Sequence, residues 1–156
     1  MNQGVHLVDL TLWLLGDVEE LYAHTGLLAH ERIEVEDTVT VTARLKSGAQ
    51  LTFQATTAAY GDLPIRMNLM GYAGSIVTEN ERVVHMHSRD GLELPEFSAV
   101  DITLEQLKDF VAAVQSGGAP LVSSAEARAA VAFIEAVYTS GRTGEPVRPA
   151  ELPQRA

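Results

Sequence analysis

Three polar side chains interrupt the apolar stretch that opens the chain, MNQGVHLVDLTLWLLG at residues 1–16. At about 100° per residue of an α-helix, Asn2, His6 and Asp9 fall on one stripe together with Trp13. An imidazole can move a proton near neutral pH, and a carboxylate one turn away can fix its tautomer. Asn2 could equally be a helix N-cap, and Asp9 a satisfied structural group. The residues alone therefore leave a reaction site and a structural role both open.

The element that carries these side chains is predicted to be a helix. Val5, Val8, Leu12 and Leu15 have the spacing of a helix that buries one face, and Gly16 is expected to end it. We expect Trp13 to lie in the core or in a pocket wall rather than to act as a stacking platform.

A period of two follows the helix and predicts strands. Residues 37–46 alternate strictly, so their apolar side chains should form one row that continues beyond a Ser47–Gly48 turn. The expected row is Val39, Val41, Ala43, Leu45, Leu51, Phe53 and Ala55. Further strands are predicted at 18–28, 65–70, 75–78 and 82–87, the last two joined by a turn at 79–81.

Two helices follow an aperiodic segment, 88–101, which we expect to be a loop. Capping boxes are predicted at Thr103 with Gln106 and at Ser123 with Glu126. The first helix should end at residues 117–118 and bury Leu104, Leu107, Phe110, Val111 and Val114. The second should end at Gly141 and bury Ala127, Ala130, Val131, Ile134, Val137 and Tyr138. The tail, RPAELPQRA at 148–156, is expected to fray.

This order of elements predicts an α+β fold, with an open, mainly antiparallel sheet and helices packed on one of its faces. The other face is rich in uncharged polar residues and poor in charges, so we expect it to be available for oligomerisation with a second copy of the chain. A solvated face is the alternative, because Thr suits strands in any case. The residues of this face are Thr38, Thr40, Thr42, Thr52, Gln54, Thr56 and Asn68.

Composition narrows the classes of partner and location. The 156 residues predict a single domain, and 11 Lys and Arg against 21 Asp and Glu give a net charge of −10. Such a surface repels phosphate backbones and anionic lipids, so neither nucleic acid nor a membrane is an expected partner. The chain has no Cys, and residues 1–16 lack the basic region of a signal peptide. We therefore predict a cytoplasmic protein.

Other clusters give weaker signals for a metal site, and none is predicted. His85 and His87 could face one side of a strand, but no third ligand is apparent. Glu34, Glu36 and Asp37 lack the spacing of a calcium loop, and a solvated loop is the expected structure there.

Five stretches in succession resemble the C-terminal half of the Gfo/Idh/MocA oxidoreductases, the glucose-fructose oxidoreductase and inositol dehydrogenase family. Together they cover nearly the whole chain: MNQGVHLVDLTLWLLG, IEVEDT at 33–38, MGYAGSIV at 70–77, LEQLKDFVAAVQSGGAPLV at 104–122 and AVYTSGRTGEPV at 136–147. The resemblance implies hydride transfer between a sugar or polyol carbon and NAD or NADP. It also implies that the chain is one substrate and oligomerisation domain.

The same resemblance assigns roles to the opening helix. His6 matches the catalytic His that shuttles the hydroxyl proton, and Asn2 matches a position that is often Asp. Because Asn cannot ionise, Asn2 is expected to bind substrate or orient His6. Asp9 matches a structural position that supports the helix.

A dinucleotide-binding half is missing from the sequence. No G-x-G-x-x-G occurs, and the family's Glu-Lys-Pro motif with its catalytic Lys is absent. We therefore expect the N-terminal Rossmann domain to be absent, and the chain alone to be inactive and to bind no dinucleotide. A third possibility to be tested is that Met1 is an internal Met of a longer reading frame or the start of a truncated product. The alternative function is a non-catalytic homo-oligomeric assembly module derived from the same fold.

Overall fold

The computed structural model describes residues 4–61, 63–80, 82–96 and 100–149. Its contacts divide into two compact units, one formed by residues 1–58 and 109–156 and the other by residues 59–108. Both units contain antiparallel strands, and the chain as a whole has the predicted α+β class. No helix within the described ranges combines the length and the hydropathy needed to cross a membrane.

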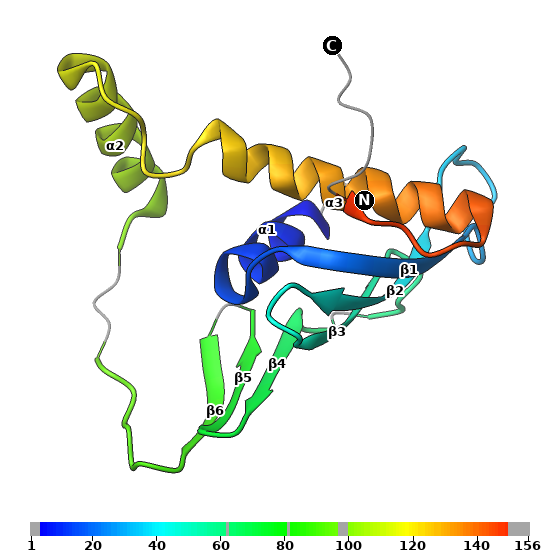
Figure 1. Ribbon diagram of the computed structural model, residues 1–156, viewed down its shortest axis with the longest axis horizontal. Coiled ribbons are helices and arrows are strands. Elements are labelled where there is room, and N and C mark those ends of the chain that lie inside the picture. The colour runs from blue at the N-terminus through cyan, green and yellow to red at the C-terminus, as the bar shows by residue number, and fades with distance from the viewer. Residues whose placement is uncertain (1–3, 62, 81, 97–99, 150–156) are drawn as a thin grey trace. The chain divides into compact units, whose positions relative to one another are not determined.

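The first unit contains a three-stranded antiparallel sheet of β1 (Val18–Gly26), β2 (Thr38–Leu45) and β3 (Gln50–Thr56), in that order. Helices α1 (Gly4–Leu15) and α3 (Ser124–Thr143) lie on the same face of this sheet (Figure 1). The predicted alternation sets the register, since the apolar side chains of β2 and β3 point toward the helices and their polar neighbours point away.

The core of this unit lies between the helices and the sheet. Val41, Leu45 and Val137 are fully buried, and Phe53 packs edge-to-face on Phe133 with 6.3 Å between ring centroids. On the opposite face, polar residues pair across the strands, as Thr40 with Gln54 and Thr42 with Thr52. Most of the predicted Thr-rich face is therefore present and exposed in this sheet, whereas Asn68 belongs to the second sheet.

Helix α3 begins as predicted and ends later than predicted. The Ser123–Glu126 capping box is confirmed, but the helix continues to Thr143 and is capped by Gly144 in a left-handed conformation. Gly141 lies inside the helix, where an added Cβ would be 2.7 Å from Oγ1 of Thr25. The glycine thus allows α3 to approach β1 closely.

The buried face of α3 also differs in part from the prediction. Ala130 and Val137 are buried as expected, while Val131 is 56% exposed and Ala127 is also exposed. The helix buries three residues that periodicity did not indicate, which are Phe133, Ala136 and Ser140. The buried stripe is therefore rotated toward these three residues.

The outer edge of β1 is covered by the segment that follows α3. Leu21 and Val147 exchange two backbone hydrogen bonds of 2.9 and 2.8 Å. The hydroxyl of Ser140 accepts the Ala23 N–H at 3.0 Å and donates to the Glu145 carbonyl at 2.7 Å. This buried hydroxyl extends the pairing of the edge strand where no backbone partner reaches it.

The second unit contains another three-stranded antiparallel sheet, formed by β4 (Arg66–Gly71), β5 (Gly74–Glu79) and β6 (Arg82–Ser88) in sequence order. The three strands lie where the period of two predicted them. They form a separate sheet, however, so the described residues contain two small sheets instead of one continuous open sheet.

Helix α2 (Ile102–Ser116) differs most from the prediction. Its first turn is capped by Asp101, whose carboxylate accepts the Leu104 N–H at 3.0 Å, and the predicted Thr103–Gln106 box is wrong. Only Ala113 is buried in this helix. The apolar side chains expected in the core are 47–66% exposed, namely Leu104, Leu107, Phe110, Val111 and Val114. The periodicity identified an apolar face, but a face is buried only where another element packs on it.

Candidate functional site

Helix α1 has a buried side and an exposed outer side, and the outer side carries the predicted catalytic residue. Val8 is 1% exposed and Thr11 is 5% exposed, and the Thr11 hydroxyl donates to the Leu7 carbonyl at 2.6 Å. His6 is exposed, because two positions before Val8 a helical side chain projects about 160° away from it. The imidazole is therefore open to solvent or to a ligand.

Several apolar side chains are exposed on this outer side, together with Asp9. Trp13 is 74% exposed, and Leu10 and Leu14 are 36% and 43% exposed. Because Trp13 follows His6 by two helical turns, the indole and the imidazole share one face. The expectation of Trp13 in the core is wrong for the described chain, while a place in a pocket wall stays a prediction. We call Leu10, Trp13 and Leu14 with His6 the outer face of α1.

The other two predicted site residues are less defined by the structure. Asp9 is exposed, and among the described residues the side chains of Asp9 and His6 make no hydrogen bond or ion pair. Asn2 lies outside the described residues. The roles of His6, Asn2 and Asp9 therefore stay predictions.

The sequence did not reveal the structural role of Asp37. Its carboxylate is buried and accepts the backbone N–H groups of Leu28, Ala29 and His30 at 2.7–2.9 Å. These donors, the one of Leu28 foremost, hold the pKa of Asp37 far below its ordinary value. The expectation of a solvated carboxylate is wrong here, since Asp37 organises the loop between β1 and β2.

A second contact ties the same loop to α3. The Tyr138 hydroxyl donates to the Glu36 carboxylate at 2.8 Å. Burial, together with this hydrogen bond to a carboxylate, raises the pKa of Tyr138 to about 12. Both acidic residues next to β2 therefore serve the loop, and the described residues contain no cluster of three or more His, Asp or Glu side chains placed to hold a metal ion.

Comparison with known proteins gives matches over most of the chain. Residues 1–77 match the family model described as the GFO/IDH/MocA C-terminal domain. D-apiose dehydrogenase of Paraburkholderia graminis is 24% identical, over 92% of this chain and 43% of that protein. Myo-inositol 2-dehydrogenase of Thermotoga maritima is 28% identical, over 84% of this chain and 43% of that protein.

A solved structure is also similar. The crystal structure of the WlbA dehydrogenase from Bordetella pertussis, in complex with NADH and UDP-GlcNAcA, matches with a TM-score of 0.82 and 26% identity. That match covers 99% of this chain and 45% of the other. The chain therefore spans less than half the length of the relatives it matches.

The fold and the matched segment indicate the class of this protein. It is an α+β domain of the type found in the C-terminal half of dehydrogenases. The chain is similar to the C-terminal domain of the Gfo/Idh/MocA family, whose model matches residues 1–77 of its 156 residues. The matched residues 1–77 include α1, so the helix that carries His6 lies in the segment that matches the family model.

Proposed function

We propose that this chain is the substrate-binding and oligomerisation half of an NAD- or NADP-dependent oxidoreductase that acts on a sugar, a polyol or a similar hydroxyl compound. The observation that carries the proposal is the exposed imidazole of His6 on the outer face of α1, with the exposed Trp13 two turns further along the same face. Exposed apolar side chains around a polar one are typical of a ligand site, and the relatives are named for apiose and inositol.

The part of this chain in such a reaction is acid–base chemistry. When a hydroxyl is oxidised to a carbonyl, the O–H proton must leave, and His6 accepts it through a ring nitrogen. In the reverse direction the imidazolium returns the proton to the carbonyl oxygen. Asn2 donates or accepts a hydrogen bond with the substrate, and Asp9 supports the helix.

The described residues do not fit a dinucleotide. Such a site requires a glycine-rich turn between a strand and the N-terminus of a helix. Gly71 and Gly74 instead close the hairpin between β4 and β5. We propose that the chain alone neither binds dinucleotide nor turns over substrate. Calorimetry with NADH should show no saturable heat, and stoichiometric binding would contradict this part.

The catalytic assignment is tested in a chimera. The nucleotide-binding half of the Thermotoga maritima relative is joined before residue 1, and NADH formation is measured with inositol, apiose and a UDP-sugar. We expect His6→Ala to lower kcat by about 10²- to 10⁴-fold, because a general acid–base contributes that much. His85→Ala removes another exposed imidazole, on β6, and should leave kcat unchanged. Equal turnover in the His6→Ala chimera and its parent would remove His6 from the mechanism.

The alternative function is a non-catalytic assembly module, which the exposed polar face of β1–β3 favours. In that case His6→Ala would leave turnover intact, while charged substitutions on the sheet face would change the assembly. The primary proposal includes both properties, a homo-oligomer through this face and catalysis through His6. It also treats the chain as one functional domain in the cytoplasm.

A further inference from the structure

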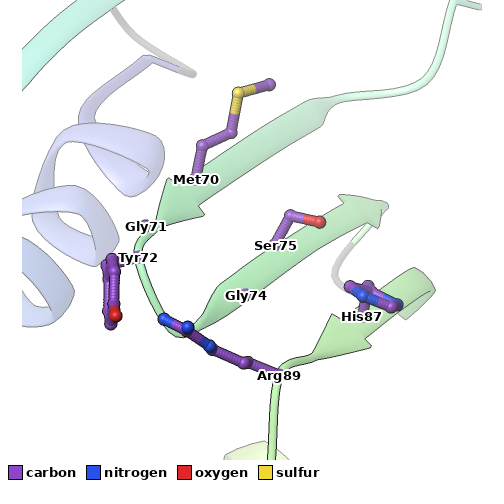
Figure 2. A pocket seen from close by; sticks show the side chains of 7 residues that line it. All are labelled: Met70, Gly71, Tyr72, Gly74, Ser75, His87 and Arg89. Carbon is purple, nitrogen blue, oxygen red and sulfur yellow. The ribbon is translucent and has the colours of Figure 1, made fainter.

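An open hollow of about 500 Å³ lies on the sheet of the second unit, within the size range of small-molecule sites. Met70, Ser75 and His87 form a cross-strand row through β4, β5 and β6, and all three line the hollow. Tyr72 and Arg89 line its other side (Figure 2). Its lining contains an arginine and a histidine and no carboxylate, in a chain of net charge −10.

Two glycines, Gly71 and Gly74, also line the hollow. Gly71 and Gly74 pair at the end of the β4–β5 hairpin and carry no side chain to fill the space. At Gly74, where φ is +159°, an added Cβ would lie 2.1 Å from the His87 carbonyl oxygen. The backbone of β5 and β6 thus admits only glycine at this position of the lining.

The cation in the hollow is held in place by an aromatic ring. The guanidinium carbon of Arg89 lies 4.4 Å from the centroid of Tyr72, and Figure 2 shows the side chain reaching from the end of β6 toward that ring. The backbone N–H of Arg89 also donates to the Ala73 carbonyl at 2.8 Å, and this bond holds the main chain of Arg89 in place. Stacking uses the flat face of the guanidinium, so the N–H donors at its edge remain available.

No acidic partner occupies those donors. Within the part of the chain that the structure describes, Arg89 makes no ion pair, whereas Arg66 on the same sheet is paired with Glu79. Ser75 and His87 are paired in register across β5 and β6, and the Ser75 hydroxyl and the His87 ring can add donors beside the guanidinium. The geometry points to an oxyanion site, in which the forked guanidinium of Arg89 binds a phosphate or carboxylate group of a small molecule. This inference is independent of the function proposed for His6.

The site can be tested on the whole 156-residue chain with inorganic phosphate and with acetate, at constant ionic strength set by chloride. Amide chemical shifts are followed by NMR during each titration. We expect at least one of the two anions to give saturable shifts confined to the turn at 71–75 and to residues 87–89. Arg89→Gln should weaken that binding about tenfold, the usual effect of losing a hydrogen bond to a charged group.

Two further variants distinguish anion binding in the hollow from non-specific attraction to positive charge on the sheet. Arg82→Gln removes an exposed arginine at the start of β6 that does not line the hollow, and it should change the affinity less than about twofold. Tyr72→Leu keeps the Arg89 charge but removes its stacking surface, so binding should weaken. Absence of saturable shifts with both anions, or equal losses in Arg89→Gln and Arg82→Gln, would overturn the inference.

Discussion

The side chain of Asp37 holds the backbone of three consecutive loop residues. Its buried carboxylate accepts three backbone N–H groups from the loop before β2 and also lies 3.2 Å from Nδ1 of His30. A neutral acid would be a much poorer acceptor for these donors. The conformation of residues 28–30 therefore depends on the ionised form of Asp37.

The lowered pKa of Asp37 makes a prediction about acid stability. Because the folded pKa lies below the ordinary value of 3.8, the carboxylate stabilises the folded chain fully above that value. That contribution is lost as the pH falls below about 4 toward the folded pKa. We expect Asp37→Asn to lower Tm at pH 7 and to flatten the fall of Tm in acid, as measured by circular dichroism.

A matched control for this prediction is Glu34→Gln, which neutralises an exposed carboxylate of the same loop. Its Tm at pH 7 should stay close to that of the parent chain. If the decrease in Tm between pH 7 and pH 3 is the same for Asp37→Asn and the parent chain, protonation of Asp37 does not cause the loss of stability in acid.

At the scale of elements, α2 and α3 show that similar periodicities lead to different burial. Both helices carry an aromatic residue on an apolar face, yet Phe133 is 2% exposed and Phe110 is 60% exposed. Phe133 packs between the sheet and α3, against Phe53. The stabilising effect of each ring should follow its burial and not its hydropathy.

Substitution of the two rings tests this difference directly. We expect Phe133→Ala to lower the free energy of unfolding by about 3–5 kcal/mol, the cost of a large cavity in a core. Phe110→Ala should cost less than about 1 kcal/mol, as for a surface position. Urea denaturation followed by circular dichroism measures both values. A large loss in Phe110→Ala would mean that α2 packs on another surface in solution.

At the scale of the whole molecule, this chain exposes two faces that a second protein surface could cover. The outer face of α1 and the polar face of β1–β3 are both exposed, and the chain spans less than half the length of its relatives. The proposed homo-oligomer would cover the sheet face. Uncharged Thr and Gln side chains can approach their own copies without like-charge repulsion.

The proposed oligomer can be tested with one substitution near the centre of the sheet face. Thr40→Arg places a cation on the middle strand, so two copies that meet through this face would bring like charges together. We expect the mass measured by light scattering to fall to that of the monomer. Ser124→Arg, at an exposed position of α3, should leave the mass unchanged. A monomeric parent chain would contradict the oligomer itself.

The sequence by itself determined the local elements of this protein. Strict alternation in residues 37–46 gave β2 its buried and exposed sides, because a strand turns successive side chains to opposite faces. The Ser123–Glu126 box located the start of α3, since it satisfies backbone groups within one turn. The family was also readable from the order of short stretches, including the helix that carries His6.

Only the tertiary structure decided which of these surfaces are covered. Segments distant in sequence decide whether Phe110 and Trp13 are buried and why Gly141 lies inside a helix. They also supply hydrogen-bond partners of Asp37 and Ser140. The division into two sheets is of the same kind, because strand periodicity does not specify which edges pair. Periodicity reports the sides of one element, whereas burial and hydrogen bonding require a second surface whose position the chain fixes only on folding.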